Sequence, residues 1–413
     1  MDIKSTDISF KSKIAAIPAT KFISSKKVPL KDLNLNGFTA LIGGDVFEHS
    51  GRIAKHDLLF LDKKLVAIDD FNPDIINSAV IKYSDVKNHT ITPAIVDQHI
   101  HGGYGISFHT AGEDEIRLLL RNLRADGTGA VVATTLPGTF EALRKQIKVL
   151  NRVIENPQEG EAKILGIHME GPFLNPKKAG VHDNISFPLP SVENFNKFEP
   201  KSVSIVTLAP ELDKDYELSK YLIRNGVIPS AGHTMASADD IEKSGIKQVT
   251  HLFNAMAPFH HRTATVANEG LLNPEITAEV IGEKTHLATS VFNMVLNEKP
   301  ADKIVLISDA LPEAGIKKDF FMNGKLIHVD DDLIPRDENG VLAGSMKFLH
   351  NLADELVKRT RMAFTDFIQY ASVNPAKNLD VYDKFIIKTG SSPNFTIWNN
   401  APLTAEKTFV NFY

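Results

Sequence analysis

Cysteine is absent from the 413-residue chain. The protein therefore contains no disulfide bond and no thiolate ligand, so any bound metal ion must be held by histidine, aspartate or glutamate side chains. This composition fits a reducing compartment, and we expect the protein to be cytoplasmic.

The sequence also lacks long apolar runs and clusters of basic residues. No apolar run reaches the roughly 18 residues that a membrane-spanning helix requires. The formal net charge is −5, and no lysine- and arginine-rich segment is interleaved with aromatic residues, which argues against nucleic acid as a partner. Since 43% of the residues are hydrophobic, we expect a soluble globular protein that binds small molecules.

The two ends of the chain differ in pattern from its middle. Residues 1–34 are rich in lysine but lack arginine and a continuous apolar segment, which disfavours a transit peptide and a secretory signal, so we expect an extension or a poorly ordered arm. Residues 35–91 contain short apolar stretches broken by glycine, aspartate and asparagine, a pattern typical of antiparallel β-structure. Strand-like sequence returns in residues 380–413, which predicts one small β-sandwich domain formed from the N- and C-terminal segments.

Residues 92–379 alternate between apolar strands and amphipathic helices. The first strand candidate ends at His99, and the others lie at 131–135, 164–168, 203–207, 227–231, 248–251, 277–282 and 303–308. The seventh is the least certain, because residues 286–291 compete with it. Helices are expected at 113–126, 140–155, 218–225 and 238–244. Eight strand–helix units predict an α/β fold, a (β/α)8 TIM-type barrel whose active site lies at the C-terminal ends of the strands.

A His-x-His pair closes the first of these strands. Alternate side chains of a strand point to the same face, so His99 and His101 leave it together, and Gly102 and Gly103 then turn the chain away. This arrangement suits a metal ion. In isolation, such a pair is more often two polar residues at the end of a strand, and it decides nothing alone.

Further histidines and carboxylates follow the other predicted strands. They are His168, Glu170, His233, His251 and Asp309. In a barrel these positions share one rim, where the side chains face a common centre, whereas purely structural roles would scatter them over both rims. Imidazoles and carboxylates without thiolates suit zinc, or alternatively iron.

The number of candidate ligands exceeds one tetrahedral site. The natural division is two metals bridged by Glu170, with the His-x-His pair on one metal and His233 and His251 on the other. Such sites activate water and polarise a carbonyl group. Asp309 is the candidate for taking a proton from that water and returning it to a leaving amine, although it could also be a further ligand.

The motifs around these residues resemble the amidohydrolase superfamily and, within it, the N-acetylglucosamine-6-phosphate deacetylases. The resemblance rests on Asp97–Gly103, Gly166–Asn175, Thr207–Glu211, Ser230–Thr234, Thr250–Met256, Ser308–Ala310 and Leu342–Ser345. Related enzymes such as dihydroorotase and hydantoinase typically bridge their metals with a carboxylated lysine on the fourth strand. Residues 203–211 contain no lysine here, and Glu170 takes that role instead.

The resemblance implies hydrolysis of N-acetylglucosamine 6-phosphate to glucosamine 6-phosphate and acetate. It makes Glu170, His233 and His251 the principal metal ligands, with His99 and His101 added where a second metal is present, and Asp309 the acid/base. Some family members lack His-x-His and use one metal, so its presence here favours two. The implied substrate contacts are His182, Asn254, Ala255 and His286, and an arginine matched by Arg262 reaches the phosphate in a neighbouring subunit, which implies a homodimer.

Several alternatives remain open from the sequence. The residues around His286, Gly282–Ala288, depart from the usual Asp-Gly-x-His pattern of the family, which affects the expected sugar contacts. Arg262 could instead be a solvated surface residue. The substrate could be another N-acyl sugar, a galactosamine epimer or a cyclic amide, and a non-catalytic binding protein is the alternative from a different class.

Overall fold

The computed structural model describes residues 26–69, 82–180, 187–322 and 324–411. The chain divides into two compact units. Met1–Ala94 and Tyr382–Phe412 form the first unit, and Ile95–Val381 form the second. We call them the β unit and the barrel unit, and each is described by itself.

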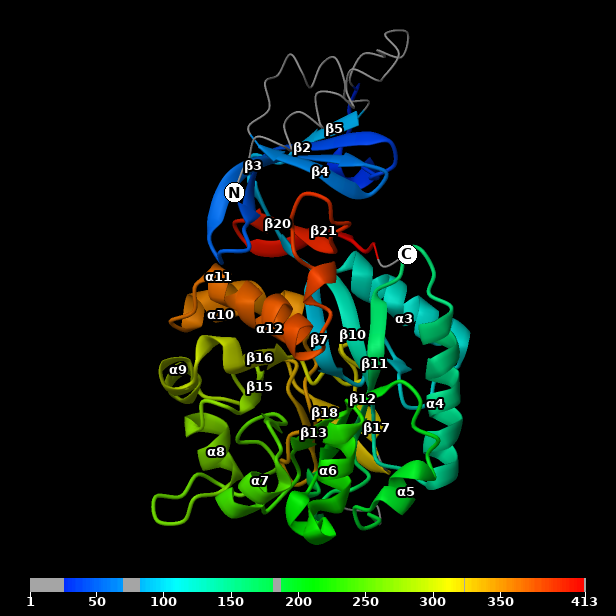
Figure 1. Ribbon diagram of the computed structural model, residues 1–413, viewed down its shortest axis with the longest axis vertical. Helices are drawn as coiled ribbons and strands as arrows, with labels where there is room; N and C mark the ends of the chain where they lie inside the picture. The colour runs from blue at the N-terminus through cyan, green and yellow to red at the C-terminus, as the bar shows by residue number, and fades with distance from the viewer. Residues whose placement is uncertain (1–25, 70–81, 181–186, 323, 412–413) are drawn as a thin grey trace. The chain divides into compact units, whose positions relative to one another are not determined.

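The barrel unit is built on eight parallel strands (Figure 1). In spatial order they are β7 (Ile95–Ile100), β10 (Thr128–Thr135), β11 (Lys163–Glu170), β12 (Val203–Leu208), β13 (Ile228–Ala231), β14 (Gln248–Val249), β15 (Thr277–Ile281) and β16 (Ile304–Ile307). The predicted TIM-type barrel is therefore confirmed, and the seventh strand lies in the 277–282 candidate. Chain order and spatial order coincide, as expected when each strand is followed by a right-handed crossover.

The barrel closes between its first and last strands at the C-terminal rim. The backbone N–H of Asp309 donates to the carbonyl of His99 at 3.0 Å, and that of His101 donates to the carbonyl of Ala310 at 2.9 Å. The buried Asp97 carboxylate adds a bond from the backbone N–H of Ser308 at 3.3 Å. The seam of the barrel thus runs between residues that the sequence singles out for chemistry.

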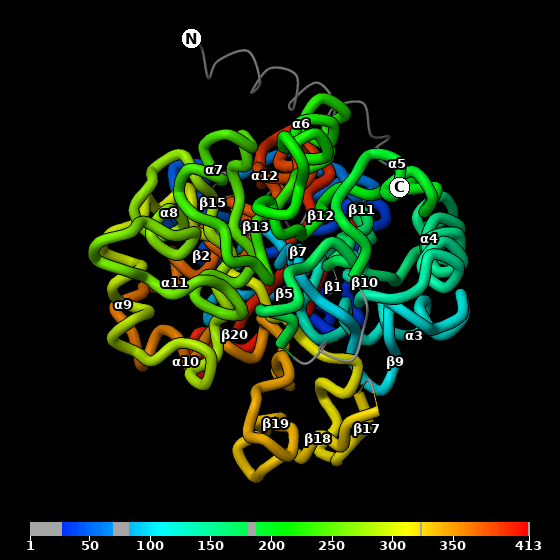
Figure 2. Tube along the Cα trace, turned by 90° about the horizontal axis from the view of Figure 1, so that it is seen from below, coloured from blue at the N-terminus to red at the C-terminus, as the bar shows by residue number. Residues whose placement is uncertain are grey.

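Helices surround the strands of the barrel unit (Figures 1 and 2). Those that the sequence predicts are α3 (Glu113–Ala125), α4 (Phe140–Glu155), α6 (Glu217–Arg224) and α7 (Ala238–Ser244). The others are α5 (Val192–Asn196), α8 (Val266–Leu272), α9 (Thr289–Glu298), α10 (Leu349–Arg359), α11 (Phe364–Ile368) and α12 (Asn374–Asn378). Local signals fix several ends: the Thr139 hydroxyl accepts from Ala142 N–H at the start of α4, and Gly245, with φ of 74°, ends α7. Among the described residues, no helix is both long and apolar enough to cross a membrane.

A small antiparallel sheet that the sequence analysis did not predict follows β16. It consists of β17 (Phe320–Met322), β18 (Lys325–Val329) and β19 (Pro335–Asp337), and it lies at one side of the barrel in Figure 2. Met322 and Ile327 pack with Leu311 of the segment after β16 in one apolar cluster. This sheet brings Met322 to the C-terminal rim.

The β unit contains one sheet of eight strands. It runs β1 (Lys26–Lys27), β5 (Lys82–Asp85), β2 (Phe38–Phe47), β6 (His89–Pro93), β20 (Phe395–Asn400) and β21 (Leu403–Phe409), with β3 (Ile53–Leu61) on β2 and β4 (Lys64–Asp69) on β3. The sheet forks along β2, because residues 39–42 pair with β5 and residues 45–46 pair with β6. Buried Leu41, Phe60 and Phe395 share its core. The expected association of the N- and C-terminal segments in a small β-domain is confirmed.

The beginning of the β unit differs from expectation. We expected an extension as far as residue 34, but β1 pairs in parallel with β5, and Leu33 is buried in the core with 2% exposure. Residues 26–34 therefore belong to the sheet and its core. The lysine-rich composition of this segment hid the short apolar sequence around Leu33, and residues 1–25 lie outside the described residues.

Candidate metal centre

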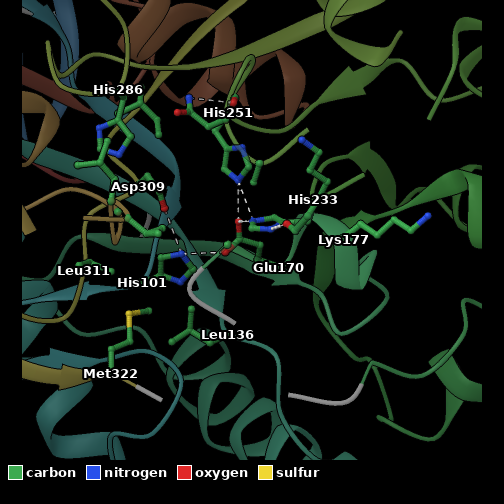
Figure 3. A pocket seen from close by; sticks show the side chains of 18 residues that line it. His101, Leu136, Glu170, Lys177, His233, His251, His286, Asp309, Leu311 and Met322 are labelled. Atoms are coloured by element: carbon green, nitrogen blue, oxygen red, sulfur yellow. Dashed lines mark hydrogen bonds and ion pairs between the residues drawn. The ribbon is translucent and has the colours of Figure 1, made fainter. Parts of the chain in front are cut away.

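The carboxylate of Glu170, at the end of β11, lies among four imidazoles, of which Figure 3 shows those of His101, His233 and His251. Its Oε1 atom is 3.1 Å from Nε2 of His251, 3.3 Å from Nε2 of His233 and 3.5 Å from Nε2 of His99. Its Oε2 atom is 3.1 Å from Nε2 of His101. All five side chains are buried, so the structure brings together the five predicted ligands from four strand ends.

These side chains form two groups that could each hold a metal ion. His99, His101 and Glu170 form one group, and Glu170, His233 and His251 form the other. The Nε2 atoms of His233 and His251 are 3.2 Å apart. Ligand atoms around a tetrahedral zinc ion lie about 3.4 Å apart, since each is about 2.1 Å from the metal. The spacing of the ligand atoms therefore fits a divalent metal in each group.

The charges in the cluster also favour a cation. Burial would raise the pKa of Glu170, but the charge of His99 and the contacts with the other imidazoles outweigh burial and hold the pKa well below its usual value. Burial would likewise lower the pKa of His99, whereas the carboxylates of Glu170 and Asp309 raise it well above its usual value. The buried carboxylates thus require positive charge beside them, which bound protons or a divalent metal can supply.

Asp309 follows β16 and points toward His101 (Figure 3). Its Oδ1 atom is 3.3 Å from Nε2 of His101 and 3.4 Å from Nε2 of His99. Burial would raise the pKa of Asp309, but the charge of His99 dominates and lowers it to about 2. An ionised carboxylate therefore lies directly beside the first group of ligands.

Three of these residues adopt left-handed backbone conformations. The φ angles are 46° at His233, 32° at His251 and 51° at Asp309. Such conformations of non-glycine residues cost about 1–3 kcal/mol each and cluster at functional sites. Here they occur where the chain leaves a barrel strand, so the turn and the functional side chain are the same residue.

Neighbouring groups fix the loop after β13. The Nδ1–H of His233 donates to the carbonyl of Lys178 at 2.8 Å, which leaves Nε2 directed at Glu170. The segment that follows is held by Glu211, whose carboxylate accepts from the hydroxyl of Thr234 and from the backbone N–H of Met235 at 2.6 Å. Glu211 belongs to a motif that the sequence analysis noted but to which it gave no role.

His168 lies beside the centre but outside both groups. Its Nε2 atom is 2.7 Å from the hydroxyl of Thr207, and its ring packs edge-on against His99 with centroids 4.5 Å apart. Burial lowers the pKa of His168 well below its usual value, so the ring is neutral. Its place on β11, two residues before Glu170, turns it to the same face, where it supports His99.

A cavity of 360 Å³ opens over the cluster. Its walls include His101, Glu170, His233, His251 and Asp309, together with three of the predicted substrate contacts, Asn254, Ala255 and His286. Lys177, Lys178 and Gly344 also line it, and the sequence analysis assigned no role to them. These two lysines do not lie at the end of a strand, so the periodicity of the sequence did not identify them as residues of the site.

The other two predicted substrate contacts are not brought to this cavity by the described structure. His182 lies outside the described residues. Arg262 lies on an exposed loop and is not among the residues that line the cavity of its own chain. The prediction that it reaches a neighbouring subunit remains a prediction.

The fold and the cluster define a TIM-type barrel with a histidine–carboxylate centre suited to two metal ions. Residues 90–412 match the Amidohydrolase family, and the chain belongs to this family. It is 32% identical over 303 residues to the N-acetylglucosamine-6-phosphate deacetylase of Bacillus subtilis, covering 71% of this chain and 76% of the relative. The human enzyme of the same name is 26% identical over 391 residues, which cover 90% of this chain and 91% of the relative.

Solved structures support the fold assignment. The N-acetylglucosamine-6-phosphate deacetylase of Thermotoga maritima superposes with a TM-score of 0.78 at 24% identity, over 90% of this chain and 100% of the other. The enzyme of the same name from Mycobacterium smegmatis gives a TM-score of 0.79 at 24% identity, over 91% and 98%. These likenesses show that the fold is shared.

We predict that Gly232→Ala destabilises the protein and disturbs His233. A Cβ atom at residue 232 would lie 2.6 Å from Cβ of Thr250 and 2.8 Å from Cγ2 of Thr207, so the strands must shift. Overpacking of this kind costs about 1–3 kcal/mol. Urea unfolding of the metal-free variant measures this loss in the free energy of unfolding.

Gly112→Ala is the matched control for this substitution. A Cβ atom there has no neighbour closer than 3.6 Å among the described residues, and the backbone φ is −75°. We expect a smaller loss of stability, because alanine is less favourable than glycine at the N-cap of α3 but meets no steric clash there. Equal unfolding free energies for the two variants would contradict the prediction.

Proposed function

We propose that the protein hydrolyses N-acetylglucosamine 6-phosphate to glucosamine 6-phosphate and acetate. The observation that carries this proposal is the position of Asp309 beside His99 and His101, at the floor of a cavity that also contains the second ligand group. The sequence identity of 32% and 26% to two N-acetylglucosamine-6-phosphate deacetylases, over most of the chain, supports this substrate. The cysteine-free composition supports action in the cytoplasm.

We assign both ligand groups to divalent metals, with zinc as the first choice and iron(II) as the alternative. The chain offers imidazole nitrogen and carboxylate oxygen only, which suits either ion. Bound there, the metal would lower the pKa of a water molecule and polarise the amide carbonyl of the substrate. Glu170 belongs to both groups and would be the ligand that the two metals share.

Asp309 performs the proton transfer in this mechanism. Its carboxylate is ionised at neutral pH, and its side chain is 11% exposed, so it can accept a proton from the attacking water at the cavity floor. The protonated carboxyl group then delivers that proton to the nitrogen of the amide as the bond to the acetyl carbon breaks. Glucosamine 6-phosphate leaves as the amine, and the acetyl group leaves as acetate.

The sugar phosphate is held by other residues that line the cavity. We assign Asn254, Ala255 and His286 to the sugar phosphate, because they line the cavity. By the family resemblance, we assign His182 to contact the substrate and to help polarise the acetyl carbonyl. Arg262 is assigned to the phosphate bound in a neighbouring subunit of a homodimer, where a guanidinium fork matches a phosphate dianion.

Acetate release tests the proposal directly. The purified protein is assayed with N-acetylglucosamine 6-phosphate, its galactosamine epimer and unphosphorylated N-acetylglucosamine, with metal content measured on the same sample. We expect a clear preference for the phosphorylated glucosamine compound. Bound metal without hydrolysis of any of the three would refute the substrate assignment and favour another N-acyl sugar or a cyclic amide.

We predict that Asp309→Asn lowers kcat by roughly 10²–10⁴-fold, because an amide cannot accept the proton. Metal content should remain unchanged, since the predicted ligands are intact. Elemental analysis and kcat are measured on the same preparation, beside His251→Gln, which should lose metal and activity together. If Asp309→Asn loses metal to the same extent, Asp309 is a ligand and its assignment as the proton carrier is wrong.

Arg262 can be tested by complementation between subunits. We expect Arg262→Gln to raise KM for the phosphorylated sugar by roughly 10–100-fold, as for the loss of a hydrogen bond to a charged group. Co-expression with Asp309→Asn should restore low-KM activity, since one site of the mixed dimer then has both native residues. The pair Asp309→Asn and His251→Gln is the control, because both changes lie in the site of their own subunit. If co-expression of Arg262→Gln with Asp309→Asn restores no more activity than the control pair, the two subunits do not share a site.

A further inference from the structure

The interior of the barrel beneath the metal centre is polar. Glu279 on β15 is completely buried. The side chains of Gln98 on β7 and Gln248 on β14 are also buried, with at most 1% exposure. The interior of a TIM-type barrel is usually filled by branched apolar side chains. A buried carboxylate here is costly unless every oxygen has a partner, so its contacts indicate its role.

Three side chains of the described structure contact the Glu279 carboxylate, and each can donate a hydrogen bond. Its Oε2 atom is 3.3 Å from Nδ1 of His99. Its Oε1 atom accepts from Nε2 of Gln98 at 2.7 Å and from Nε2 of Gln248 at 3.1 Å. The side-chain oxygens of both glutamines in turn accept from Nδ2 of Asn378, at 3.1 and 2.8 Å, which fixes the direction of the amides.

This network determines the tautomer of His99. Because a carboxylate can only accept, the proton of a neutral His99 lies on Nδ1, and Nε2 carries the free lone pair. That Nε2 atom is the one that faces Glu170 and Asp309. We infer that Glu279 is a positioning residue that keeps Nε2 of His99 available to the metal held by His99, His101 and Glu170.

The effect is confined to one of the two ligand groups. In the other group, the Nδ1–H of His233 donates to the carbonyl of Lys178 rather than to a carboxylate. Glu279 therefore distinguishes the two metal positions, because it adds a negative charge behind the ligands of the first, whereas in the second a neutral backbone carbonyl accepts from His233. The inference rests on the two-metal centre of the proposed function but not on the identity of the substrate.

Glu279→Gln tests this inference with little change in volume. The substituted amide has one oxygen where three donors converge, so its NH2 group must face at least one of them. Proton transfer of His99 to the Nε2–H tautomer relieves that conflict, but it removes the lone pair from the metal. Outer partners of metal-bound histidines are typically worth 10–100-fold in metal affinity.

The experiment measures metal binding rather than catalysis. Metal-free protein is prepared with a chelator, and Zn²⁺ is titrated against a competing indicator while stoichiometry is measured by elemental analysis. We expect two ions per subunit in the wild type. For Glu279→Gln we expect one tight ion and a second bound 10–100-fold more weakly, and for Glu279→Asp partial recovery, because the carboxylate is restored. Selective ¹⁵N labelling of histidine reports whether Nδ1 of His99 carries the proton in the zinc-loaded protein.

Gln248→Met is the matched control. It removes a donor to Glu279 from the same buried layer but leaves the contact between Glu279 and His99 in place, so both ions should bind with nearly wild-type affinity. Equal weakening in Gln248→Met and Glu279→Gln, or unchanged binding of both ions in Glu279→Gln, would overturn the inference. A wild-type protein that binds no metal would overturn the metal centre itself, whereas two ions without acetate release would refute only the substrate.

Discussion

The rest of the barrel unit depends on one buried carboxylate, that of Glu170. A buried carboxylate is unfavourable by several kcal/mol unless opposite charge and hydrogen-bond partners surround it. The four imidazoles around it come from the ends of β7, β13 and β14, so compensation is available only when these strands are in register around the barrel. The charge that makes the site useful to a cation also makes it sensitive to the geometry of the fold.

The closure of the barrel and the assembly of the site are the same event. The backbone of Asp309 donates to the carbonyl of His99 across the seam, while its side chain approaches the ring of the same histidine. Left-handed backbone at His233, His251 and Asp309 turns each functional side chain inward as its strand ends. The strain of these turns is tolerated because the surrounding strands and hydrogen bonds allow no other path.

Much of the architecture could be read from the sequence because local signals and topology agreed. Strands buried on both faces appear as short apolar runs, and amphipathic helices with clear ends separate them. Once eight such units are recognised, polar residues that follow the strands must meet at one rim, which is why Glu170 and His251 could be placed together across 81 residues of sequence. Strands of only three residues, such as β17 and β19, gave no such signal, and β1 was hidden in a lysine-rich segment.

The sequence by itself determined the barrel, the donor atoms of the candidate metal centre and the family, because these depend on periodicity and on residues at strand ends. Tertiary structure alone decided how those atoms are oriented. Glu279 looks like a single polar residue within a short apolar strand, and it meets His99 across a separation of 180 residues. Likewise, Lys177 and Lys178 of the cavity wall lie in a connection between elements, where the sequence has no periodic pattern that predicts the direction of a side chain. Strand periodicity specifies the face of a side chain, but its partners across the barrel exist only after the sheet has closed.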